Sequence, residues 1–306
     1  MRLAEHRRRA QGLADLLLYD SLVDDGVMLL QDGALLAAWS FRGPDMASAT
    51  AGEMAALSAR LNSILRFGAG WMIQCDSIRS RAPEYPGRGA FPDPVTQIID
   101  DERREQFTSQ GAHFENDYFL SLTYLPPEQN EERVRGWMFD GSREFKSSAQ
   151  KMLEYFTARV AGFEDVFGSL FQVRRLRTEQ SRDELLRYVH RCVTATDHPI
   201  ACPEIPVYLS DLLATQDFVG GIAPRIGSRY MRAVAVDGFP RLSFPGILAA
   251  LDALPIEYRW HTRAILLDPE EARSMLDKTR RKWRSKIRGW KDQIMRTETG
   301  DRKSVV

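Results

Sequence analysis

The dipeptide Asp32-Gly33 lies between two β-rich runs and constrains the fold of this chain more than any other feature of its sequence. The runs cover residues 26–31 and 34–42. Aspartate followed by glycine accepts the positive φ angles of a two-residue turn, so this pair is typical of a tight connection between antiparallel strands. The sequence therefore predicts a β-hairpin near the start of the fold.

Signals for helices and further strands alternate after the hairpin. Thr50 and Glu53 have the spacing of a capping box, as do Ser181 and Glu184, and apolar residues then recur at helical spacing. Helices are predicted at residues 51–65, 94–109, 145–163, 181–193, 245–253 and from 268 onward. Strands are predicted at residues 71–78, 114–125, 171–176, 230–236 and 256–267. The four prolines in residues 81–94 indicate an ordered surface loop.

This mixture predicts an α+β fold, with mixed and partly antiparallel sheets flanked by helices. We expect an α+β lobe from residues 1–127 and a second α+β lobe from residues 128–267. A long basic, amphipathic linker helix and a tail are expected in residues 268–306.

The bulk composition excludes several classes of protein. With 306 residues and 43% apolar composition, the chain can bury a large core. Its 42 basic and 42 acidic residues cancel, so a charged partner must be met by a local patch. The three cysteines form no paired framework, and no apolar run approaches the length of a spanning helix, which favours the cytoplasm.

Known chemical motifs give no catalytic, nucleotide or metal candidate. The dipeptide Gly-Lys does not occur, so the sequence has no phosphate-binding loop, and it has no Gly-x-Ser-x-Gly or His-Glu-x-x-His motif. Four potential zinc ligands lie close together in the sequence, namely His190, Cys192, His198 and Cys202. Their spacing matches no standard zinc motif, so a helix end with a buried cysteine is the favoured interpretation.

The last predicted helix carries the most informative pattern. Apolar residues recur at heptad-like spacing, at Leu276, Trp283, Ile287, Trp290 and Ile294. Basic residues without an acid among them surround this seam from residue 278 to 291. The candidate interaction residues are Lys278, Arg280, Arg281, Lys282, Trp283, Arg284, Ile287 and Trp290. They are suited to a neighbouring domain, to an acidic partner or to an anionic membrane surface, whereas nucleic acid is not expected because the tryptophans fall on the seam.

Several segments resemble TrbE-type conjugal-transfer ATPases of type IV secretion systems. Residues 13–74 resemble the start of that family, beginning LADLLLYDSLVDDGVMLLQDGALLAAWSFRGPD. Residues 115–127 (ENDYFLSLTYLPP), 257–268 (EYRWHTRAILLD) and 278–283 (KTRRKW) agree in the same order. The resemblance thus extends over nearly the whole chain.

The resemblance implies the amino-terminal assembly region of a conjugation motor, located peripherally at the inner face of the cytoplasmic membrane. It implies contacts with inner-membrane secretion subunits and homo-oligomerisation. ATP and Mg²⁺ would belong to a motor region expected beyond Val306, so we expect no cofactor and no ATP hydrolysis in this chain alone. Two alternatives stay open, namely a DNA-binding adaptor and an enzyme whose site includes the loop at residues 81–94.

Overall fold

A computed structural model describes residues 12–44, 48–109, 113–126, 143–203, 205, 207–235, 242–244 and 246–287, of which 143–148 and 285–287 are described as backbone. Its centre is a seven-stranded antiparallel sheet with the order β1-β2-β3-β5-β4-β12, in which β6 also pairs with β3. The strands are β1 (Tyr19–Asp24), β2 (Val27–Leu30), β3 (Leu35–Arg42), β4 (Trp71–Arg81), β5 (Phe114–Tyr124), β6 (Gln172–Arg175) and β12 (Tyr258–Ile265). The fold is therefore mixed α+β, as predicted.

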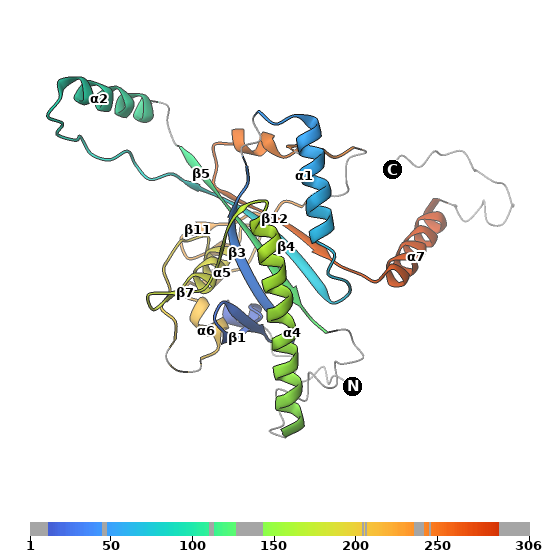
Figure 1. Cartoon of the computed structure of the whole chain (residues 1–306). Coiled ribbons are helices and arrows are strands. Elements are labelled where there is room, and N and C mark those ends of the chain that lie inside the picture. Colours follow the sequence, from blue (N-terminus) through green and yellow to red (C-terminus); the bar gives the residue numbers. More distant parts are fainter. Residues whose placement is uncertain are drawn as a thin grey trace.

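Six α-helices occur in the described residues. They are α1 (Ala51–Ile64), α2 (Pro94–Ser109), α4 (Arg143–Gly168), α5 (Glu184–Thr194), α6 (Leu209–Leu213) and α7 (Pro269–Ile287). Short elements complete the description, namely the 3₁₀ turns η2 (Ala14–Leu16) and η4 (Ala249–Ala253) and the strands β7 (Thr178–Glu179), β8 (Arg182–Asp183), β9 (Phe218–Val219), β10 (Arg225–Ile226) and β11 (Arg229–Tyr230). Figure 1 shows α4 and α1 against the sheet, with α2 and α7 apart from it on opposite sides of the molecule.

The predicted hairpin is confirmed, because β2 and β3 pair in antiparallel fashion across Asp32 and Gly33. Gly33 has φ of 86°, as such a turn requires. The capping box is also confirmed, since the Glu53 N–H donates to the Thr50 hydroxyl and the Thr50 N–H donates to the Glu53 carboxylate. Local turn and cap chemistry thus places the first two elements.

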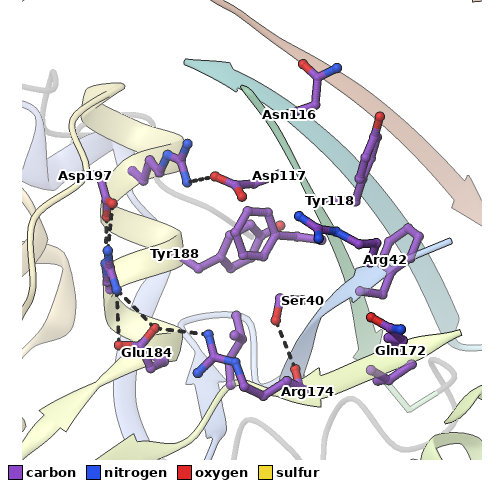
Figure 2. Close-up of a pocket in the computed structure, with 16 residues that line it drawn as sticks. Ser40, Arg42, Asn116, Asp117, Tyr118, Gln172, Arg174, Glu184, Tyr188 and Asp197 are labelled. Atoms are coloured by element: carbon purple, nitrogen blue, oxygen red, sulfur yellow. Dashed lines mark hydrogen bonds and ion pairs between the residues drawn. The ribbon is translucent and has the colours of Figure 1, made fainter. Parts of the chain in front are cut away.

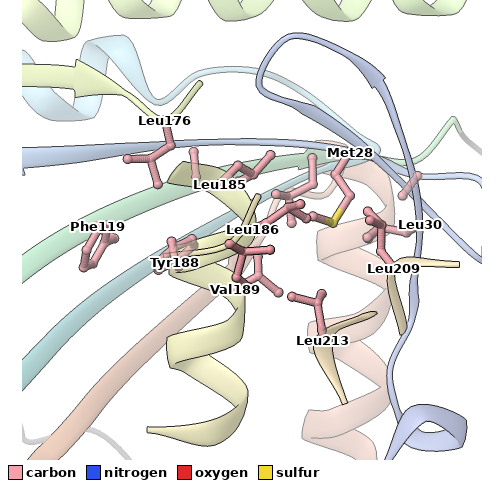
Figure 3. Packing of buried hydrophobic residues seen from close by; sticks show 14 of the residues in the cluster. Met28, Leu30, Phe119, Leu176, Leu185, Leu186, Tyr188, Val189, Leu209 and Leu213 are labelled. Atoms are coloured by element: carbon pink, nitrogen blue, oxygen red, sulfur yellow. The ribbon is translucent and has the colours of Figure 1, made fainter. Parts of the chain in front are cut away.

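Both faces of the sheet are covered, and alternate residues of each strand enter different clusters. On one face the strand residues Met28, Leu36 and Phe119 pack against α5 and α6, as Figure 3 shows for Leu185, Leu186, Val189, Leu209 and Leu213. The opposite face buries another cluster against α4. Its large members are Trp39, Trp71, Leu122, Phe156, Val160, Phe163 and Phe167.

Strands from both predicted lobes join this one sheet. β6 and β12 belong to the range 128–267, yet they pair with β3 and β4 of the range 1–127. Both apolar clusters likewise combine residues of the two ranges. Residue 127 itself lies outside the described residues, so the division into lobes stays a prediction.

Three local predictions were wrong. Ser181 does not cap α5, because Gln180 and Ser181 have positive φ and form the turn between β7 and β8, while the Asp183 carboxylate accepts from the Leu186 N–H at 2.8 Å. In the predicted strand at 230–236, β11 ends at Tyr230 and residues 231–235 are not in a strand, since β propensity alone forms no strand without a paired neighbour. The helix predicted at 245–253 is reduced to the 3₁₀ turn η4.

Candidate interaction surfaces

Helix α7 begins where its sequence signals indicate, with Pro269 in the first turn and Glu270 and Glu271 near the positive end of the helix. In Figure 1 it projects away from the sheet. The predicted interaction residues Lys278, Arg280, Arg281, Lys282, Trp283 and Arg284 are all exposed on it. The backbone of Ile287 ends the helix as described, while its side chain and the whole of Trp290 lie outside the described residues.

The apolar seam of α7 faces solvent in this chain. Leu276 is 69% exposed and Trp283 is 64% exposed, and Met275 beside them is also exposed. Exposed large apolar side chains that are grouped and rimmed by charge typically mark a binding surface. The helix therefore presents an uncovered amphipathic face, and the predicted packing of this seam on a neighbouring domain does not occur among the described residues.

A second surface is a polar groove of about 440 Å³ between the sheet and α5. The ends of β3, β5 and β6 form its floor, and one side of α5 forms its wall (Figure 2). Phe119 and Tyr188 lie at its base with their ring centroids 4.6 Å apart in a stacked arrangement. The groove combines an aromatic base with a charged rim.

Arginine and carboxylate groups alternate along that rim. Arg187 binds Asp197 through two hydrogen bonds of 2.6 and 2.7 Å, and Glu184 lies within 3.5 Å of both Arg187 and Arg174. On the other side, Arg191 donates to Asp117 at 2.8 Å.

Figure 2 shows Arg42 extending into the same groove, and no carboxylate among the described residues pairs with it. Arg42 is thus the lining cation that an incoming carboxylate meets first.

A buried carboxylate holds the groove wall and β12 in place. Asp76 of β4 is completely buried and accepts hydrogen bonds from the Tyr188 hydroxyl at 2.5 Å and the Arg259 Nε at 2.6 Å. His261 Nδ1 lies 2.9 Å from the same carboxylate. The Arg259 guanidinium also donates to the Cys192 carbonyl oxygen at the end of α5. One acid therefore ties β4, β12 and α5 together.

These contacts set the ionisation of the network. Burial alone would raise the pKa of Asp76, but the hydrogen bond and positive charge of Arg259, with hydrogen bonds from Tyr188 and His261, lower it below its ordinary value. Burial raises the pKa of Tyr188 well above its ordinary value, and burial raises the pKa of Cys192 to about 12. Near neutral pH, Asp76 is charged whereas Tyr188 and Cys192 keep their protons.

The histidines and cysteines considered as zinc ligands have other partners. His190 is buried and its Nε2 lies 2.9 Å from the Thr215 hydroxyl, and burial lowers its pKa. The described residues contain no group of three His, Cys, Asp or Glu side chains arranged to hold a metal ion. The adjacent carboxylates Asp100 and Asp101, expected on a solvated face, both bind Arg104.

The Asp76 network was missed by sequence reasoning. Its one signal is an acid in a strand whose neighbours Ile73 and Ile78 are apolar. Arg259 and His261 lie more than 180 residues away in sequence, so no local pattern reveals the contact.

Within the described stretches of the chain, no helix has the length and apolar character needed to cross a membrane.

Residues 26–132 match the family model of the type IV secretion system ATPase VirB4/TrbE, N-terminal domain. The conjugal transfer protein TrbE of Rhizobium radiobacter is 40% identical over 311 residues, covering 97% of this chain and 38% of that protein. The chain thus spans about two fifths of the length of this curated relative.

In Sinorhizobium fredii (strain NBRC 101917 / NGR234), a probable conjugal transfer protein TrbE is divided into two separate proteins, and both match this chain. The first of them is 50% identical over 131 residues, which cover 41% of this chain and 88% of that protein. The second is 39% identical over 158 residues, 48% of this chain and 24% of that protein. The chain therefore belongs to the VirB4/TrbE family of type IV secretion ATPases and contains the N-terminal domain of that family.

Proposed function

We propose that this chain is an assembly module of a conjugal-transfer ATPase, which docks the motor onto inner-membrane secretion subunits and supports oligomerisation. It acts at the inner face of the cytoplasmic membrane. ATP and Mg²⁺ are bound by the region of TrbE-type proteins that extends beyond the 38% matched by this chain. The contribution of the module is to offer surfaces to other macromolecules.

The uncovered amphipathic face of α7 carries this proposal. Its apolar residues Met275, Leu276 and Trp283 are exposed, and it has seven basic residues against three acidic ones. Burying such a face against an acidic partner removes apolar area from water and satisfies the positive charge. The groove of Figure 2 supports the proposal with a second polar surface, where Arg42 is available to a carboxylate of a partner.

The experiment is affinity capture of the full chain co-expressed with the inner-membrane subunits of its conjugation system and extracted in detergent. We expect those subunits in the captured fraction, and their loss when Arg280, Arg281 and Arg284 are each changed to glutamate. A control with the same change in charge is Arg60→Glu, Arg66→Glu and Lys151→Glu, which alters exposed residues on other elements. Phosphate release from ATP is measured on the same preparations, and hydrolysis without captured subunits would reverse the proposal in favour of an enzyme.

A DNA-binding adaptor is the second candidate, because the basic residues of α7 are exposed in a row from Lys278 to Arg284. That function predicts an affinity for single-stranded DNA that falls steeply with salt. The triple α7 variant separates the two functions: loss of DNA binding with unchanged subunit capture supports the adaptor.

A further inference from the structure

Helix α2 is held away from the body of the molecule. The pairing of β4 with β5 continues to Arg81 and Phe114, and α2 lies beyond this two-stranded extension. Figure 1 shows the helix at the far end of the extension and on the opposite side of the molecule from α7. We define the arm as residues 82–109, which this extension carries.

The inner face of α2 is occupied by contacts within the arm and at its return to β5. Tyr85 donates to Asp100 at 3.2 Å, and Arg104 donates to the same carboxylate at 2.7 Å. The ring of Phe107 stacks on His113 with centroids 3.8 Å apart, and its centroid lies 5.6 Å from that of Tyr85. These contacts fix the orientation of the helix, so its opposite face must point outward.

The outer face of α2 is apolar and uncovered. Val95 and Ile98 are each 61% exposed, and Ile99 is 47% exposed. Their spacing of three and four residues places them on one stripe, which Glu102 continues by one more turn. A shallow hollow lined by α2 residues, including Ile98, Ile99, Glu102 and Glu105, runs along this face. Normally the apolar stripe of a surface helix faces the core of its own domain.

The two projecting helices are complementary in charge. Helix α2 has four carboxylates against two arginines, whereas α7 has seven basic residues against three acidic ones. On the outer face of α2, Glu102 and Glu105 form no ion pair among the described residues. On α7, Arg280 and Arg284 flank Leu276 and Trp283 within about one turn.

We propose that the outer face of α2 in one copy of this chain packs against the face of α7 formed by Met275, Leu276 and Trp283 in the next copy. Glu102 and Glu105 then oppose Arg280 and Arg284. The inference rests on the oligomerisation included in the proposed function and names the two surfaces that produce it. Because α2 and α7 lie on opposite sides of the molecule, each copy has one of each surface free, and the contact is head-to-tail.

Head-to-tail contacts of this kind build a ring when the rotation between copies closes. A single helix pair buries less than the about 1,600 Å² of a standard stable interface, so one contact is weak by itself. In a closed ring every copy makes two contacts, and the second is formed within the same particle. Association is therefore expected to rise with concentration and to fall with added salt.

The test is sedimentation velocity of the full 306-residue chain over a concentration series. The arm variant carries Glu102→Lys and Glu105→Lys, and the helix variant carries Arg280→Glu and Arg284→Glu. Each variant alone should raise the dissociation constant at least about tenfold. An equimolar mixture should associate again, because the reversed arm of one variant then meets the reversed α7 of the other. Glu154→Lys with Asp165→Lys on the exposed side of α4 is the control and should associate like the parent chain.

Three results would overturn the proposal, namely a parent chain that stays monomeric throughout, variants that associate like the parent, or a mixture that fails to recover. Vesicles containing anionic lipid are tested in parallel. If the helix variant loses vesicle binding but still self-associates, α7 faces a membrane and not a second copy. Capture of inner-membrane subunits is a separate readout, so failure of this contact leaves the assembly function standing.

Discussion

Removal of the Asp76 carboxylate tests whether the buried network holds the domain together. Asp76 is fully buried, and the groups bound to it come from β12 and α5, which are distant in sequence. Asp76→Ala removes the acceptor for all three groups. Asp76→Asn keeps the shape and one carbonyl oxygen but removes the charge.

The size of the effect follows from what each partner loses. Breaking a buried ion pair by removing one member costs about 3–5 kcal/mol. The side chains of Arg259 and His261 are 35% and 36% exposed, so water solvates part of their charge and the lower end applies. We therefore expect a loss of about 3 kcal/mol in the free energy of unfolding for Asp76→Ala, with about 1–2 kcal/mol for Asp76→Asn.

The effect also depends on pH with a defined sign. The pKa of Asp76 is lower in the folded chain than its ordinary value, so the ionised carboxylate stabilises the fold above the ordinary pKa of about 4. This contribution is lost as pH falls through the lowered folded pKa. The gap in stability between the parent chain and Asp76→Asn should accordingly be larger at about pH 5 than at about pH 3.

Thermal and urea unfolding followed by circular dichroism measure these differences. A loss of about 3 kcal/mol corresponds to a fall of at least about 6 °C in Tm for a chain of this size. Asp165→Asn on the exposed side of α4 is the matched control and should shift Tm by little. An Asp76→Ala variant as stable as the control would show that the network contributes nothing net, and the reasoning would be refuted.

Two further substitutions test the local structure by the same unfolding measurements. Gly26→Ala should destabilise strongly, because Gly26 has φ of 68° and a Cβ there would lie 2.5 Å from the Leu176 carbonyl oxygen, whereas Gly87→Ala should be near neutral since nothing lies within 4 Å of that position. Thr50→Ala should cost about 0.5–2 kcal/mol through loss of the capping bond to Glu53, and a Thr50→Ser variant that fails to restore stability would contradict this explanation.

Local chemistry made the secondary structure of the first half predictable. The Asp32-Gly33 turn and the Thr50 capping box are short-range hydrogen-bond and backbone devices, and each works through residues three or fewer positions away. The bounds predicted for α2 at 94–109 agree with Pro94–Ser109. The second half was less predictable, because Ser181 serves a turn and Asp183, two residues later, provides the cap.

The candidate interaction residues of α7 were also visible in the sequence, since basic charge and heptad spacing need no knowledge of the fold. Their exposure was not. Whether a Trp stripe is buried depends on which elements lie beside it, and Trp283 is uncovered because the sheet places α7 away from the core clusters.

The sequence by itself determined the element types, the first hairpin, the start of α7 and the family of the chain, because turns, caps and periodicity act over a few residues. Only the tertiary structure decided that β12 pairs with β4, that Asp76 meets Arg259, and that the apolar stripe of α2 points outward. Each of those outcomes joins segments distant in the chain or depends on what covers a face. Contacts of this kind are chosen by the packing of the whole domain, which no short stretch of sequence contains.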